Sequence, residues 1–581
     1  MKRFLLTFLA VIAAHAFLFF LLCFLAISLM GAALMGRAGK PAEVPKTAYL
    51  IQEIPPDLPE FIPSSDLPFP PRPTSHTDIL ENLEKARVDE RIQGVVLKFD
   101  MPQMGWGKLQ ELRERIHQLR DAGKPVWAYT TFATNKGMYL ASACDSIFVH
   151  PDGFIWLTGF NAERIYARRL LDRLGIESQV SQIKEYKAMA EMVLREDMSR
   201  EARENASWLL EDLFEEFLST LSHDRGVDRS LVNDWLETGQ FDAREARERG
   251  IIDRDLLWEE IEERLGGGMR AGWSVDGDDY AEVPRGKLHL KGSKIAVVHG
   301  VGTIAQGESG WVFPLGVSMG DETMVAALQE AIENDAVKGI LLRLDTPGGL
   351  TTASDRIGRM VEKAASEKPL VVSMVDVNAS GGYMVSYRCS TLVALPNSIV
   401  GSIGSISMKP NLTGMLEKVG ITVDRVTVGP HATMLSTLAS FTDEEFARLE
   451  ELHWRTYSAW VEGVAHYRGM TLDEVDHLAR GRVFTGRQAV VNGLIDELGG
   501  FDRALELLKQ QAGIDPESEV TFIHLPKQKG FLERLAEGDL LSALHVALSG
   551  FPSGEPLNDT VAFWKRGMAS NDALALLWWQ F

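Results

Sequence analysis

The chain has 581 residues, with 60 Lys+Arg against 81 Asp+Glu and a net charge of −21. This length predicts several domain-sized units, and a composition of 45% apolar residues can fill sizeable cores. The acidic balance argues against nucleic-acid binding, because phosphate contacts need clustered Lys and Arg. The three cysteines are too few for a disulfide scaffold or a four-cysteine metal site. We expect no nucleic-acid partner, no cofactor and no metal.

The N-terminal segment 4–36 contains no Asp, Glu, Lys or Arg. About 20 apolar residues span a bilayer, whereas the apolar region of a cleavable signal peptide has about 7–15, so this run predicts a transmembrane signal-anchor. Because Lys2 and Arg3 lie at its short end, we expect a cytoplasmic N-terminus and a translocated main portion. Residues 37–75 form a predicted spacer, since ten of the chain's 24 prolines lie within residues 41–73.

After the spacer, apolar strand-like runs alternate with amphipathic helical patterns, which predicts an α/β fold. The runs at 95–100 and 340–345 resemble each other, and further matches recur at an offset of 243 to 245 residues. Chance similarity does not hold one register over about 150 residues, so we predict two homologous repeats. Their expected bounds are 46–265 and 290–525, with a linker at 266–289 and a C-terminal tail at 526–581.

The second repeat contains two glycine-rich turns, each after an apolar run: Asp-Thr-Pro-Gly-Gly at 345–349 and Asn-Ala-Ser-Gly-Gly-Tyr at 378–383. Ser380 lies among small residues, as a nucleophilic hydroxyl on a strand-to-helix turn requires if a carbonyl is to approach it. The peptide N–H groups of Gly349 and Gly381 are suited to form a two-donor oxyanion hole. Together the two turns predict a site for nucleophilic catalysis.

The first repeat differs at the same two places. It reads Asp-Met-Pro-Gln-Met at 100–104 and Asn-Lys-Gly-Met-Tyr at 135–139. The Gly-Gly pair is missing, and Lys136 stands where the second repeat has Ser380. We therefore expect a degenerate site in this copy.

A nucleophilic serine needs a base, and the residues leave two kinds of base open. A Ser–His–Asp triad would take a histidine of the second repeat, such as His431, which follows a strand-like run. A Ser–Lys dyad would take a lysine whose pKa is lowered by burial. The second repeat has no lysine between Lys418 and Lys509, whereas Lys184 and Lys187 lie in the first-repeat segment that corresponds to the His431 segment. If there is a dyad, the first repeat supplies its lysine.

These motifs resemble those of the S49 serine peptidases, in the long, duplicated, membrane-anchored form of the signal peptide peptidases. The resemblance runs from the anchor to about residue 525. The turn at 378–383 looks like the family's nucleophile motif, and 346–349 looks like its Ser-Pro-Gly-Gly loop. Gly-Ser-Ile-Gly at 401–404 looks like a further family motif, and Tyr-Lys at 186–187 looks like its lysine motif.

The resemblance implies a Ser–Lys dyad protease built from two tandem ClpP/crotonase-like α/β domains. It implies Ser380 as nucleophile and Lys187 as general base. Ser402 would orient the lysine, and Gly349 and Gly381 would supply the oxyanion donors.

Three features depart from this pattern or compete with it. Ala188 stands where the family has a serine after the lysine, and Thr346 replaces the loop serine. Lys184 is a rival base, because at helical spacing it would share a face with Lys187.

The family implies a membrane-anchored serine endopeptidase that degrades cleaved signal peptides and other apolar peptides. It also implies a homotetramer in the bacterial inner membrane, with the catalytic domains on the periplasmic side. Two other functions stay open: a crotonase-like acyl-thioester enzyme, which shares the oxyanion hole but uses a carboxylate, and an inactive membrane scaffold. Ser380 in its small-residue turn favours the protease over both.

Overall fold

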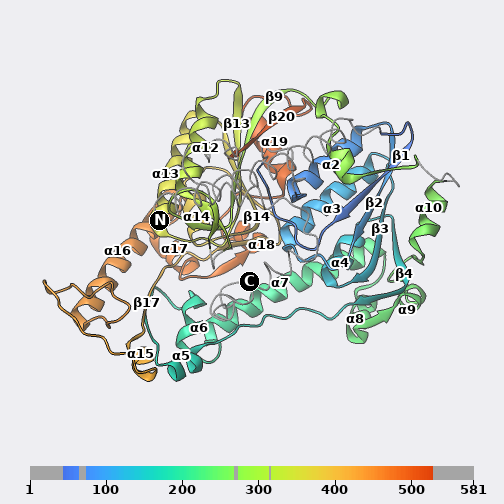
Figure 1. The fold of residues 1–581 in the computed structure, drawn as a ribbon. Coiled ribbons are helices and arrows are strands. Elements are labelled where there is room, and N and C mark those ends of the chain that lie inside the picture. The colour runs from blue at the N-terminus through green and yellow to red at the C-terminus, as the bar shows by residue number, and fades with distance from the viewer. Residues whose placement is uncertain (1–43, 64–72, 267–271, 313–315, 528–581) are drawn as a thin grey trace, which may run out of the picture.

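A computed structural model describes residues 44–63, 73–266, 272–312 and 316–527. The predicted signal-anchor at 4–36 lies outside the described residues, as does nearly all of the C-terminal tail. Within the described ranges, no helix combines the length and the apolar character needed to cross a membrane. Figure 1 shows two sheets with helices packed against them, which confirms the α/β class.

In the described part of the first repeat, seven strands form a sheet in the order β6-β4-β3-β2-β1-β8, with β7 beside β4. Strands β1 to β4 are parallel to one another, whereas β6 is antiparallel to β4. The predicted linker at 266–289 contains β8, which pairs with β1. The strands are β1 (Ala48–Ile54), β2 (Ile92–Phe99), β3 (Val126–Ala133), β4 (Ser146–Trp156), β6 (Gln240–Asp242), β7 (Arg254–Asp255) and β8 (Ser274–Asp276). The helices are α2 (His76–Val88), α3 (Trp106–Asp121), α4 (Asn135–Ala141), α5 (Arg168–Leu174), α6 (Glu191–Leu194), α7 (Arg200–Arg225), α8 (Arg229–Thr238), α9 (Ala243–Glu248), α10 (Trp258–Gly266) and α11 (Gly277–Ala281).

The second repeat builds a sheet of eight described strands in the matching order β18-β16-β14-β13-β9-β20, with β15 beside β14 and β19 beside β15. The strands are β9 (Ser293–Val301), β13 (Val337–Thr346), β14 (Leu370–Ala379), β15 (Leu392–Ala394), β16 (Ile399–Gly401), β18 (Val483–Thr485), β19 (Glu497–Leu498) and β20 (Val520–Leu525). A small sheet adds β10 (Thr303–Ala305), β11 (Gly310–Val312) and β12 (Gly316–Gly320). The helices are α12 (Asp321–Glu333), α13 (Thr351–Glu367), α14 (Gly381–Ser386), α15 (Thr413–Lys418), α16 (Asp443–Arg468), α17 (Leu472–Leu478), α18 (Gly486–Val491) and α19 (Phe501–Gln511).

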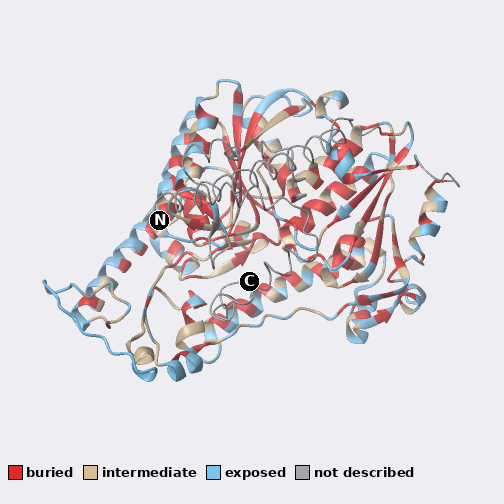
Figure 2. Cartoon of the chain, in the orientation of Figure 1, coloured by how far each residue is buried: buried red, intermediate tan, exposed pale blue. Residues whose placement is uncertain are grey.

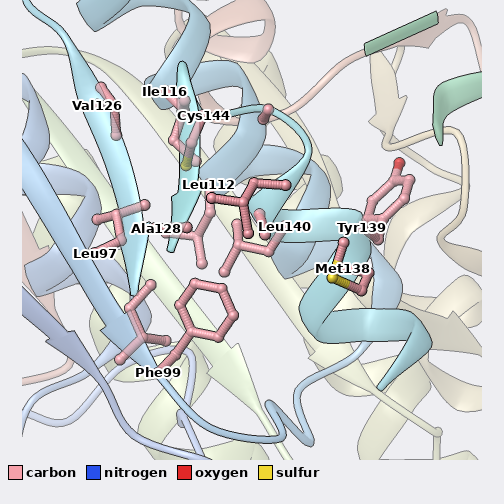
Figure 3. Packing of buried hydrophobic residues seen from close by; sticks show 14 of the residues in the cluster. Leu97, Phe99, Leu112, Ile116, Val126, Ala128, Met138, Tyr139, Leu140 and Cys144 are labelled. Carbon is pink, nitrogen blue, oxygen red and sulfur yellow. The ribbon is translucent and has the colours of Figure 1, made fainter. Parts of the chain in front are cut away.

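The cores follow from the apolar strands that the sequence predicts. Figure 2 shows buried residues concentrated along the strands and on the helix faces turned toward them. In the first repeat, side chains of β2 and β3 pack against those of α3 and α4, among them Leu97, Phe99, Val126, Ala128, Leu112, Ile116, Met138 and Leu140 (Figure 3). Cys144 and Cys389 are both buried and free, so these two do not form a disulfide.

One segment of the first repeat leaves its own sheet and joins the second repeat. After β4 the chain runs extended across the lower part of Figure 1 to α5 and then to β5 (Glu177–Gln182). Strand β5 pairs antiparallel with β17 (Ile406–Asn411) of the second repeat. This pairing brings the residues that follow β5 to the carboxyl end of the second sheet.

Candidate active site

The serine turn connects the carboxyl end of β14 to the start of α14. Ser380 has φ 56° and ψ −118°, a conformation that a residue with a Cβ adopts only under strain. Its N–H donates to the Gly401 carbonyl oxygen at 2.8 Å, which ties the turn to β16. Strained backbone of this kind at a strand-to-helix turn is characteristic of exposed nucleophiles.

The two glycine turns meet beside Ser380. A Cβ added at Gly348, which has φ +99°, would lie 2.6 Å from the Gly381 nitrogen and 2.8 Å from the Ser380 Cβ. A Cβ at Gly381 would lie 3.0 Å from the Gly349 nitrogen. No side chain fits between the turns, so glycine is required for this close approach. The two peptide nitrogens expected to form the oxyanion hole are therefore brought together.

The loop that carries Gly349 is held by its neighbours. The Thr346 hydroxyl oxygen accepts a hydrogen bond from the Gly348 N–H at 3.1 Å. Ile304 of β10 donates to the Gly348 carbonyl oxygen at 2.8 Å and accepts from the Leu350 N–H at 3.0 Å. Thr346 thus supplies a hydroxyl where the family that the motifs resemble has a serine, and the Gly349 N–H takes no part in these bonds.

Lys187 belongs to the first repeat and follows β5, the strand that pairs with β17. Its side chain reaches Ser380. Its Nζ lies 2.8 Å from the Ser380 Oγ, 2.8 Å from the Ser402 Oγ and 2.9 Å from the Ser402 carbonyl oxygen. Only 7% of Lys187 is exposed. The structure therefore brings together Lys187, Ser380 and Ser402, although 193 residues separate Lys187 from Ser380.

Burial lowers the pKa of Lys187 from 10.5 to about 7. The cause is desolvation, which disfavours the ammonium form, and the oxygen atoms around Nζ belong to neutral hydroxyl and carbonyl groups. At neutral pH a substantial fraction of the amine is uncharged. Such an amine can accept the proton of a serine hydroxyl within hydrogen-bond distance.

The two alternative bases lie elsewhere. Lys184 has φ 69°, and its Nζ forms an ion pair with Asp476 at 3.0 Å. Because the backbone at Lys184 is not helical, the assumption that it shares a face with Lys187 is wrong. The Nδ1 of His431 lies 3.1 Å from Glu445, and its side chain is 54% exposed.

The degenerate turn of the first repeat is occupied by its lysine. Lys136 Nζ donates to the carbonyl oxygens of Gln103 at 3.2 Å and Met104 at 2.8 Å. These residues lie in the loop that corresponds to the Gly-Gly loop of the second repeat. The ammonium thus holds that loop in place.

Sequence reasoning missed the segment that packs against the lysine backbone. Arg480 accepts from the Tyr186 N–H through its carbonyl oxygen at 3.0 Å, and Gly481 lies against Lys187. Arg482 accepts from the Ser402 N–H in the same way. Their one signal is a glycine between two arginines directly before a strand.

We expect Gly481→Ala to lower kcat about 10²-fold with little change in KM. Gly481 has φ +86°, and a Cβ there would lie 2.4 Å from the Lys187 nitrogen and 2.6 Å from its Cβ. Lys187 must therefore move, and a displacement of about 1 Å at a catalytic group can reduce turnover about 10²-fold. Steady-state kinetics on a peptide, the substrate class that the motifs predict, measure the effect.

Gly469→Ala is the matched control for that variant. Gly469 has φ +65°, and a Cβ there would meet nothing within 4 Å. This variant carries similar backbone strain without displacing a neighbour, so its kcat should equal that of the wild type. An equal loss of activity in both variants would show that strain, and not movement of Lys187, is the cause.

Comparisons with known proteins identify the family of this chain. Residues 118–269 and 362–515 match the model of "Peptidase family S49". "Serine protease SPPA, chloroplastic" from Arabidopsis thaliana is 30% identical over 467 residues, which cover 79% of this chain and 69% of that protein. "Protease 4" from Haemophilus influenzae is also 30% identical over 467 residues, covering 76% of this chain and 73% of that protein. "Putative signal peptide peptidase SppA" from Enterococcus faecium is 34% identical over 191 residues, covering 33% and 56%.

A solved structure of a ClpP1 mutant from Listeria monocytogenes is 15% identical, with a TM-score of 0.24, and covers 37% of this chain and 94% of that one. So slight a likeness does not establish a shared fold, and the ClpP/crotonase-like topology stays a prediction. Together with the α/β fold, the matched family and relatives define a serine protease with a duplicated architecture. The chain belongs to peptidase family S49, which confirms the family that its motifs resemble.

Proposed function

We propose that this protease is a membrane-anchored endopeptidase that uses a Ser380–Lys187 dyad to degrade cleaved signal peptides. The observation that carries the dyad is the 2.8 Å distance between Ser380 Oγ and the Nζ of Lys187, a lysine that is only 7% exposed. An acyl-thioester enzyme with a carboxylate base does not require a serine hydroxyl beside a lysine amine. The pair therefore favours peptide hydrolysis over acyl-thioester chemistry.

In the proposed mechanism, the neutral Lys187 amine takes the Ser380 proton as Oγ attacks the peptide carbonyl carbon. The N–H groups of Gly349 and Gly381 donate to the oxyanion that forms. The Lys187 ammonium then protonates the leaving amine, and an acyl group remains on Ser380. Finally, Lys187 takes a proton from the water that hydrolyses this ester, and it returns a proton to the serine oxygen.

Ser402 is proposed to orient the base. Its hydroxyl and its carbonyl oxygen both lie within 2.9 Å of Lys187 Nζ. Neither group carries a charge that would stabilise the ammonium form and raise the pKa of the lysine. Ser402 can therefore fix the direction of the amine without making it a weaker proton acceptor at neutral pH.

The substrate and location are proposed from the sequence and the relatives. The apolar segment 4–36 has the length of a membrane anchor, and one relative is named a putative signal peptide peptidase. We propose a homotetramer in the bacterial inner membrane, with the N-terminus in the cytoplasm and the catalytic domains in the periplasm. Apolar peptides released into the membrane by preprotein cleavage would then be the substrates.

The test uses the full-length protein in detergent with a synthetic signal peptide. We expect the wild type to cleave it, and Ser380→Ala and Lys187→Ala to leave it intact. A soluble, polar peptide of equal length is the control substrate, and we expect a lower kcat/KM for it. Equal cleavage of both peptides would contradict the signal-peptide assignment, whereas cleavage by a folded Ser380→Ala variant would contradict the dyad.

A further inference from the structure

A lysine of the first repeat lies between two aspartates of the second. Lys108 Nζ, on α3, contacts the Asp345 Oδ2 at 2.6 Å and the Asp376 Oδ2 at 2.9 Å. The side chains are 8%, 14% and 11% exposed, respectively. Although burial by itself lowers the pKa of Lys108, the two aspartates raise it above its ordinary value, so the ammonium persists. This buried cluster joins the two repeats.

The start of α3 adds backbone contacts to the same cluster. The Gly105 N–H donates to the Asp376 Oδ2 at 3.1 Å, and the Lys108 N–H donates to the Asp376 Oδ1 at 2.9 Å. Asp376 therefore caps a helix of the other repeat, where a carboxylate is favoured by the free N–H groups and the helix dipole. Asp345 accepts from the Val377 N–H at 3.2 Å, which links β13 to β14.

The position of the cluster connects it to the active site. Asp345 directly precedes the loop that carries Gly349, and Asp376 lies four residues before Ser380. The β13–β14 ladder is regular up to Leu344 opposite Met374, and it resumes only at Thr346 opposite Asn378. Regular pairing is thus interrupted where the two catalytic turns begin. Lys108 and the start of α3 bridge the strands at that interruption.

We propose that Lys108 is a positioning residue that sets the oxyanion loop at the correct distance from Ser380. The proposal rests on the proposed dyad mechanism, in which Gly349 and Gly381 must face one developing oxyanion. It also gives the degenerate site a role, since Lys136 holds the loop that leads into α3. The first repeat, having lost the nucleophile, supports the geometry of the second.

The first test replaces the lysine. In full-length Lys108→Met we expect kcat to fall about 10²-fold, with KM changed less than about threefold, because a small displacement of oxyanion donors impairs the transition state more than substrate binding. Labelling of Ser380 by a fluorophosphonate should slow in parallel. Lys98→Met is the matched control. Lys98 lies on β2 and forms an ion pair with Glu53 at 3.0 Å, and the kcat of this variant should equal that of the wild type.

Two further variants separate positioning from stability. Lys108→Met combined with Asp345→Asn and Asp376→Asn removes the unpaired buried charges, so it should recover melting temperature without recovering kcat. Gly105→Ala keeps every charge, but its Cβ would lie 2.1 Å from the Asp376 Cγ. It should lower kcat about 10²-fold through displacement alone, and it decides the matter if Lys108→Met does not fold.

Wild-type kcat in folded Lys108→Met or Gly105→Ala would overturn the inference. So would recovery of both melting temperature and kcat in the triple variant, since that pattern describes a purely structural lysine. Failure of the dyad itself is distinguishable, because Ser380→Ala would then retain turnover whatever the behaviour of the Lys108 variants.

Discussion

Ser380→Ala should lower kcat for peptide hydrolysis by about 10⁴-fold or more without unfolding the protein. The substitution deletes the hydroxyl whose Oγ lies 2.8 Å from Lys187 Nζ. It keeps the Cβ, so the strain at φ 56° is unchanged and no core volume is lost. The measurement is kcat at saturating peptide, together with the melting temperature and the circular dichroism spectrum.

Ser366→Ala is the matched control for this result. Ser366 is an exposed residue of α13, and its hydroxyl donates to the Lys363 carbonyl oxygen at 2.7 Å. The control should retain wild-type kcat. If folded Ser380→Ala kept wild-type turnover, the nucleophile would lie elsewhere and the proposed use of this turn would fail.

Activity should rise with pH through one deprotonation centred at about 7, and Lys187→Arg should abolish it as completely as Lys187→Met. Burial lowers the pKa of Lys187 to about 7, and only the neutral amine can take the Ser380 proton. Arginine stays protonated at every accessible pH, so it cannot replace this base. The measurement is kcat/KM from about pH 5 to about pH 10 on a peptide without titrating groups near the cleavage site, a range that extends about two pH units below neutrality and about three above it.

Lys184→Arg is the control, because it keeps a cation beside Asp476 and should preserve both the rate and the pH profile. Loss of activity in Lys184→Met with wild-type rates in Lys187→Met would reverse the assignment of the base. A profile that rises only near pH 10, the range of an ordinary lysine, would contradict the effect of burial.

The same burial couples folding stability to pH. Lys187 titrates at about 7 in the fold, against an ordinary value of 10.5 when unfolded. Between these values the unfolded chain binds more protons, so the lysine's contribution to the free energy of unfolding rises with pH and is lowest below pH 7. We therefore compare the free energy of unfolding of Lys187→Met with that of the wild type at each pH. This difference should favour the variant by about 4 kcal/mol more at pH 6 than at pH 10. Urea unfolding at both pH values measures this difference, and an equal gap at both would contradict it.

The sequence by itself determined the features that a short segment contains. Apolar runs alternating with segments of helical apolar periodicity predicted the α/β class. The spacing of apolar residues within a short segment indicates which strands and helix faces are buried. The small residues around Ser380 predicted its turn, since only glycine permits the close approach found at Gly348 and Gly381. The internal offset predicted a duplication, and the family match covers one region in each half of the chain.

Only the tertiary structure decided which distant residues share a buried site. Lys184 and Lys187 are three residues apart, yet one pairs with Asp476 and the other lies against Ser380. That choice depends on the pairing of β5 with β17 and on the non-helical backbone at Lys184. Lys108 meets its two aspartates across 237 and 268 residues. The pKa of a side chain depends on desolvation and on charges from remote segments, which local periodicity does not record.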